Sequence, residues 1–165
     1  MNTGTMQWVG WTLAGLLGTL VMDAGGGVFR STGLTHGAPP QLLGRFFLSV
    51  LRGHFTDLDP SIPPDASFSL AFVLPIHYAI GTALGAVYGL GVRLWASPPP
   101  WWLPILYGIG TTALPALWMF PAMGFGLFGL RGPNEFRLLT TALVNHLLFG
   151  IGLALAAIVV VPRVR

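Results

Sequence analysis

The chain has 165 residues, of which 53% are hydrophobic and only 8% are charged. A soluble domain usually carries about 25% charged residues, so this composition excludes a soluble enzyme, a disordered protein and a nucleic-acid-binding domain. The net charge of +3 comes from scattered arginines and forms no basic stripe. The lack of cysteine excludes disulfides, thiolate metal sites and cysteine nucleophiles. The composition therefore predicts an integral membrane protein.

Four segments of the chain meet or approach the length of about 20 mostly apolar residues that a helix needs to cross a bilayer. They predict an all-α integral membrane protein that forms a single four-span domain over residues 1–165. The predicted transmembrane helices cover about residues 7–25, 67–92, 101–123 and 138–161. We expect the first helix to be retained and not to be a cleaved signal peptide. No Lys or Arg precedes it, and no clear small-x-small cleavage site follows it.

The first connection contains a segment with helical spacing at about residues 40–52. Its apolar side chains fall on one helical face: Leu42, Leu43, Phe46, Phe47, Val50 and Leu51. Arg45, Ser49 and Arg52 fall on the opposite face, so we predict an amphipathic helix in the membrane interface, with packing on the ends of the spans as the alternative. The acidic, proline-rich stretch with Asp57 and Asp59 is interpreted as a solvated loop rather than a cation site.

Prolines and glycines mark the second half of the chain. Pro115 and Pro121 interrupt the third span and predict a kinked helix. Glycines are frequent at residues 124–129, which predicts a turn region or a loop that dips into the membrane. Five arginines lie in the first and third connections and three on the side of the termini, among them Arg163 and Arg165. This asymmetry favours termini outside the cytoplasm.

Three ionisable residues lie inside the predicted spans. Because the spans alternate in direction, His77 and His146 fall roughly 12 to 15 Å below one membrane surface. Asp23, near the end of the first span, and Asn145 come to similar depth on the same side. Polar groups at this depth are costly, so they are candidates for function. Hydrogen bonding between helices, a site for a divalent metal ion, a histidine-ligated haem or chlorin, and a proton relay or substrate pocket are all compatible with these residues.

Small residues follow each of the two intramembrane histidines in steps of four positions. They are Gly81, Gly85 and Gly89 after His77, and Gly150 and Ala154 after His146. Four-residue spacing places them on one face of each helix, where they allow neighbouring membrane helices to approach closely. The pattern predicts tight helix contacts along the second and fourth spans.

The sequence also resembles a family of small bacterial inner-membrane proteins that is catalogued as a domain of unknown function. The resemblance rests on five segments in the same order along the chain: residues 18–23, 44–45, 77–81, 119–126 and 146–150. It departs from the family pattern in the run of glycines at residues 25–27 and in a short third loop. The resemblance implies a four-span bacterial membrane protein and again draws attention to Asp23, His77 and His146.

We therefore expect a non-enzymatic, multi-pass protein of the bacterial inner membrane that is an accessory, assembly or packing subunit of a larger membrane complex. Its expected partners are the lipid bilayer and other membrane-protein subunits or further copies of itself, and no nucleic acid. The alternative is a small transporter or a metal- or haem-binding membrane protein that uses Asp23, His77 and His146. For an enzyme, the sequence offers no nucleophile motif and no paired acids.

Overall fold

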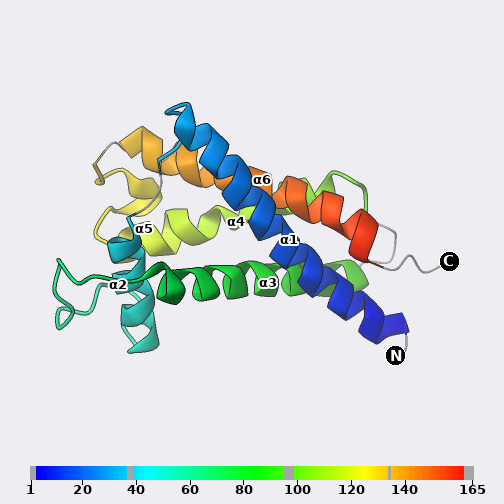
Figure 1. Ribbon diagram of the computed structural model, residues 1–165, viewed down its shortest axis with the longest axis horizontal. Coiled ribbons are helices and arrows are strands. Elements are labelled where there is room, and N and C mark those ends of the chain that lie inside the picture. The colour runs from blue at the N-terminus through cyan, green and yellow to red at the C-terminus, as the bar shows by residue number, and fades with distance from the viewer. Residues whose placement is uncertain (1–2, 37–38, 95–98, 134, 162–165) are drawn as a thin grey trace. The chain divides into compact units, whose positions relative to one another are not determined.

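The computed structural model describes residues 3–36, 39–94, 99–133 and 135–161, and its regular secondary structure in these ranges is entirely helical. The long helices are α1 (Thr3–Ser31), α3 (Leu70–Leu94) and α6 (Glu135–Val160), and a shorter helix α2 (Pro40–Leu51) precedes α3 (Figure 1). The third span begins with α4 (Leu103–Thr111), passes through a π-helical turn η1 (Pro115–Met119) and ends in α5 (Phe120–Ala122).

Four helical stretches in the described part of the chain are long and apolar enough to cross a membrane, as the sequence predicts. They are Thr5–Ser31, Leu70–Leu94, Leu103–Ala122 and Phe136–Val160. The boundaries differ from the predicted ones by a few residues, except that the first helix continues well beyond Asp23 to Ser31. Residues 95–98 of the second connection and the terminal Arg163 and Arg165 lie outside the described residues.

The first helix runs through the glycines at 25–27, although each glycine in a helix interior costs about 1 kcal/mol relative to alanine. In the hydrocarbon core this cost is outweighed, because every backbone group needs a hydrogen bond and a helix supplies it. Two of the glycines also lie at contacts with α6. A Cβ atom built on Gly25 would lie 2.9 Å from Leu148, and one on Gly26 would lie 2.9 Å from Asn145.

The third span changes its helical form where the prolines occur. Pro115 and Pro121 have no N–H to donate to the carbonyl four residues earlier, so a regular α-helix cannot continue unchanged past them. The chain passes this point through the π-helical turn and stays helical as far as Ala122. The segment at residues 124–129, for which we predicted a turn or a loop that dips into the membrane, folds into a turn with a short 3-10 helix, η2 (Leu127–Gly129).

The chain divides into two compact units. The first unit comprises Met1–Val28, Tyr78–Thr111 and Val144–Arg165, and the second comprises Phe29–His77 and Thr112–Leu143. The core of the first unit includes Trp11, Tyr88, Phe149 and Leu153. The indole of Trp11 meets the ring of Tyr88 edge to face, with centroids 5.0 Å apart.

Glycines form the crossing points of the helices in the first unit. A Cβ atom on Gly85 of α3 would lie only 2.6 Å from the Cα atom of Gly15 on α1. Likewise, a Cβ atom on Gly108 of α4 would lie 2.5 Å from the Cα atom of Gly150 on α6. These separations are too short for any larger residue, so the predicted tight contacts along the second and fourth spans are confirmed.

In the second unit, α2 crosses the first turns of α3 (Figure 1). Phe46 and Phe47 of α2 are buried together with Val73 of α3 and with Ala122 and Met123 at the end of the third span. Apart from the exposed Leu51, the apolar face of the predicted amphipathic helix is thus taken up by protein contacts, which agrees with packing on the ends of the spans. Its location in the membrane interface stays a prediction.

The glycine crossing between α1 and α3 gives a direct test of packing. We expect Gly85→Ala to lower the free energy of unfolding by about 1 to 3 kcal/mol, because its methyl group overpacks the contact with Gly15. The matched control is Gly91→Ala on the same helix, where a Cβ atom meets nothing within 4 Å. That change should be neutral or stabilising through helix propensity. Unfolding by SDS titration of detergent-solubilised protein, followed by circular dichroism, measures both; equal losses would contradict the crossing.

Candidate functional site

Asp23 lies inside the first spanning helix and is held by a tyrosine from the neighbouring helix. It is eight residues before the end of α1, or about 12 Å along the helix axis. The Tyr78 hydroxyl of α3 donates a hydrogen bond to the Asp23 carboxylate. The aspartate side chain is nevertheless exposed on the surface of the described chain. A carboxylate at this depth requires protein or water as its neighbour.

His146 lies near the middle of α6 and bonds to a threonine of the third span. Its Nδ1 atom is 2.7 Å from the Thr111 hydroxyl oxygen. That hydroxyl donates its single proton to the Gly108 carbonyl at 2.6 Å, so in this pair Nδ1 of the histidine carries the proton and donates. The neutral imidazole is therefore the tautomer with its lone pair on Nε2. Metal-binding histidines are commonly fixed in the same way by an oxygen acceptor on the other ring nitrogen.

A third polar side chain of the first unit lies next to His146. The side-chain oxygen of Asn145 is buried and has no hydrogen-bond partner among the described residues. It lies close to Gly26 of α1, where the missing side chain makes room for the carboxamide. A buried polar group without a partner is costly. Asn145 is therefore, after His146, a second unusual polar position in this part of α6.

The structure places the predicted site residues in different units. Asp23 and His146 belong to the first unit, whereas the half-buried His77 is the last residue of a segment of the second. Within each unit, the described residues include no group of three or more histidine, aspartate or glutamate side chains that could hold a metal ion. A site that combines Asp23, His77 and His146 stays a prediction.

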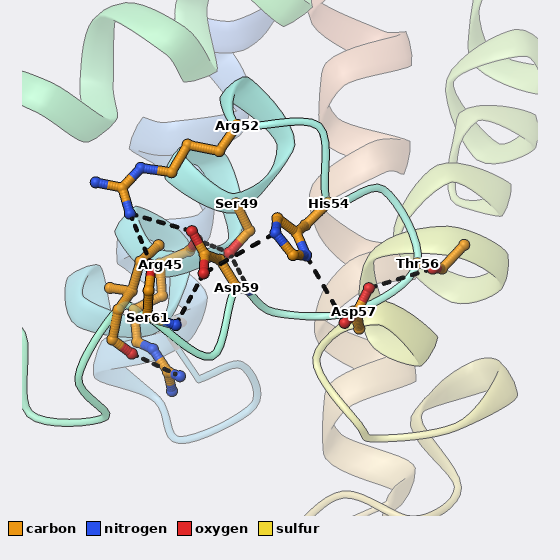
Figure 2. Close-up of polar contacts among 9 residues, drawn as sticks. Arg45, Ser49, Arg52, His54, Thr56, Asp57, Asp59 and Ser61 are labelled. Carbon is orange, nitrogen blue, oxygen red and sulfur yellow. Dashed lines mark hydrogen bonds and ion pairs between the residues drawn. The ribbon is translucent and has the colours of Figure 1, made fainter.

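A second polar cluster lies in the second unit and joins α2 to the loop that follows it (Figure 2). Asp59 is its centre and is buried, with 5% of its surface exposed. One carboxylate oxygen is 3.1 Å from Nη1 of Arg52, and the other accepts the backbone N–H of Ser61 at 2.8 Å. The interpretation of this stretch as a solvated loop was therefore wrong for Asp59, although Asp57 is exposed.

The same cluster ties the loop to the last turns of α2. The buried Ser49 hydroxyl accepts the backbone N–H of Asp59 at 2.8 Å and donates to the Arg45 carbonyl at 2.7 Å. Nε2 of His54 approaches the Asp59 carboxylate at 3.9 Å. Because the proton of Ser49 is committed to a carbonyl and its side chain is enclosed, the serine is a structural link and has no nucleophilic role.

Hydrogen bonds explain the acidity of Asp59. Those from the side chain and backbone of Ser61, followed by the one from Arg52, lower the pKa of Asp59 from 3.8 to about 2. The contact between an aspartate and the N–H two residues later is an Asx turn, which a sequence such as Asp59-Pro60-Ser61 favours. The sequence could have predicted this turn, but not its contacts with Arg52 and Ser49, which depend on the fold.

The family described as "protein of unknown function (DUF2938)" matches residues 12–160. The chain belongs to this family. The match agrees with the resemblance noted from the sequence motifs, and it spans both the intramembrane polar residues and the cluster around Asp59. Comparison with curated proteins and with solved structures finds no match. Membership in DUF2938 therefore brings no assigned activity, and a function has to be argued from the geometry.

The lowered pKa of Asp59 predicts an acid-sensitive loop in this DUF2938 member. A group whose pKa falls on folding stabilises the folded state above its unfolded pKa and loses this contribution as the pH falls from about 4 to 2. The Trp118 indole N–H donates to the Phe55 carbonyl of the loop at 2.6 Å, so its ¹⁵N–¹H signal in micelles reports whether the loop is docked. We expect that signal to shift between pH 4 and 2.

Two variants distinguish the effect of the buried Asp59 on the acid transition from that of the exposed Asp57. Asp59→Asn should remove most of the acid-induced shift of the Trp118 signal, because the ionised group that holds Arg52 is gone. Asp57→Asn should retain it, because Asp57 is exposed and contacts the neighbouring Thr56 and His54, at 3.3 and 3.8 Å, rather than Arg52. An unchanged acid transition in Asp59→Asn would show that another group controls the loop.

Proposed function

We propose that this protein is a non-enzymatic accessory, assembly or packing subunit of a larger complex in the bacterial inner membrane. The observation that carries the proposal is a change of character along one exposed face of α1. As far as Leu20 this face presents large apolar side chains: Met6, Val9, Leu13 and Leu20. From Asp23 onward it presents Asp23, Ala24 and Gly27, which are also exposed, with the apolar Val28 beside them. Positions three, four and seven residues apart share a helical face.

Small and polar residues are typical of contacts between membrane helices, whereas large apolar residues suit lipid. Gly27 is not used in packing within the protein, because a Cβ atom there would meet nothing within 4 Å. Gly15 and Gly18 of the same helix, by contrast, are needed at internal crossings. The second half of α1 thus offers a polar, closely approachable surface to a helix from another subunit.

A bulky side chain at Gly27 should block such a partner without disturbing the fold. We expect Gly27→Trp to release the protein from its complex when native membranes are solubilised in mild detergent and resolved on native gels. Gly91→Trp on α3 is the matched control, because a Cβ atom at that exposed glycine also meets nothing within 4 Å. Both variants should unfold at the same denaturant concentration as the wild-type protein.

Two results would overturn the subunit proposal. One is a wild-type protein that leaves its native membrane only as a monodisperse assembly of its own chain. The other is a complex that survives Gly27→Trp as well as it survives Gly91→Trp, since this would place any partner away from α1.

The orientation of His146 supports a second candidate, a small transporter or a metal- or haem-binding membrane protein. The Thr111 hydroxyl fixes the imidazole with its lone pair on Nε2, which is the form that binds a metal ion or haem iron. Asp23 and His77 are the other ligands predicted from the sequence. In this case the hydrogen bond to Thr111 would serve to orient a ligand rather than only to join α4 and α6.

The second candidate is tested by an absorption spectrum and metal analysis of protein purified gently from its native membrane. It predicts a Soret-type band or a stoichiometric metal ion that is lost in His146→Ala and His77→Ala. Thr111→Val, which removes only the orienting acceptor, should weaken metal binding about 10- to 100-fold, as loss of a hydrogen-bond partner of a ligating histidine commonly does. A colourless, metal-free wild-type protein would rule the candidate out.

A further inference from the structure

A groove with a volume of about 300 Å³ opens on the side of the second unit. One wall is formed by the third span with Ala116 and Leu117, and the other by α6 with Leu139 and Leu143. Phe128, from the loop between them, also lines the groove. The walls are almost wholly apolar, and every lining residue lies in the same unit.

The groove is built from two irregular pieces of backbone. Ala116 and Leu117 belong to the π-helical turn, and such turns are frequent at functional sites. Phe128 has a φ angle of 56°, which among the described residues is the only positive φ outside glycine. An aromatic residue adopts this conformation only where its surroundings enforce it. The loop that enforces it is closed by the Arg131 N–H, which donates to the Phe125 carbonyl at 2.8 Å.

The position of the groove decides what occupies it. Both walls belong to helices that are long and apolar enough to cross the membrane, so the groove faces hydrocarbon and not water. An apolar surface that has no atoms against it loses dispersion contacts, and the acyl chains of lipids are the apolar molecules at hand inside a bilayer. The volume falls at the lower end of the range of small-molecule sites.

The turn that supplies Phe128 to the groove also carries an arginine, Arg131. The Arg131 side chain is exposed, and its Cγ and Cδ atoms pack on Gly126, where a Cβ atom would lie 3.1 Å from both. Within the part of the chain that the structure describes, its guanidinium has no ion-pair or hydrogen-bond partner. The nearby Arg137, by contrast, donates to Nε2 of His36 at 2.8 Å.

We propose that this groove binds one acyl chain of an anionic phospholipid, whose headgroup phosphate contacts Arg131. Basic side chains at the ends of clefts between membrane helices bind anionic headgroups in this way. Phe128 and Arg131 belong to one closed turn, so the turn that supplies an apolar wall of the groove also carries an exposed cation three residues later. The site lies in the second unit and makes no use of the α1 face proposed for a partner subunit.

Native mass spectrometry of protein reconstituted with equal amounts of phosphatidylglycerol and phosphatidylcholine tests the site. We expect one retained phosphatidylglycerol per chain from the wild-type protein. Ala113→Trp fills the groove from the third span and should abolish this retention, and Leu143→Trp should do so from the opposite wall. Gly110→Trp, at an exposed glycine with nothing within 4 Å, is the control on the same helix and should retain the lipid.

The headgroup contact is tested separately. Arg131→Gln should keep one bound phospholipid but lower the preference for phosphatidylglycerol over phosphatidylcholine by about fivefold, the effect of one surface cation on an anionic lipid. Arg93→Gln, at the end of α3, should leave the preference unchanged. The proposal is overturned if the wild-type protein retains no lipid, if Gly110→Trp loses lipid as readily as both groove variants, or if Arg131→Gln keeps the full preference.

Discussion

Close approach of helix backbones at glycine is the constraint on which the first unit depends. Inside a bilayer two apolar helices gain nothing by leaving water, so they are held together by van der Waals contact and hydrogen bonds. The crossing of α4 and α6 at Gly108 and Gly150 shows how this constraint sets the polar site. Thr111 lies one turn after Gly108 and His146 one turn before Gly150, and the crossing brings them to 2.7 Å. A larger residue at either glycine would separate the histidine from the hydroxyl that fixes its tautomer.

The sequence was sufficient for the spans because hydropathy over about 20 residues and regular small-residue spacing are local properties. The end of α1 was harder to predict, since three consecutive glycines argue against a helix by propensity. The environment reverses that preference, because Gly25 and Gly26 lie against α6 and a helix satisfies the backbone in hydrocarbon. Amphipathic spacing likewise predicted α2 but could not tell whether Phe46 and Phe47 meet lipid headgroups or protein, because that depends on residues more than 20 positions away.

The polar sites were predictable only in part, for a related reason. Hydropathy identifies Asp23 and His146 as unusual, but their partners Tyr78 and Thr111 lie on other helices and are set by the crossings. Asp59 differs from these residues. Its Asx turn depends on neighbouring sequence, whereas its burial depends on how the loop packs. Charge pattern alone made it a loop aspartate. Its place against Arg52 follows from the loop folding back on the last turns of α2.

The cost of placing Asp23 in hydrocarbon bears on the subunit contact proposed for the exposed face of α1. A carboxylate near the centre of a spanning helix costs about 2.5 to 3.5 kcal/mol on insertion scales. A hydrogen bond between membrane helices returns about 0.6 kcal/mol on average and about 1.7 at most. The bond from Tyr78 offsets part of the cost, and lipid chains next to Asp23 offer no hydrogen bond. In the proposed complex, a polar group from a neighbouring helix, admitted by the small residues Ala24 and Gly27, would add a further hydrogen bond to Asp23.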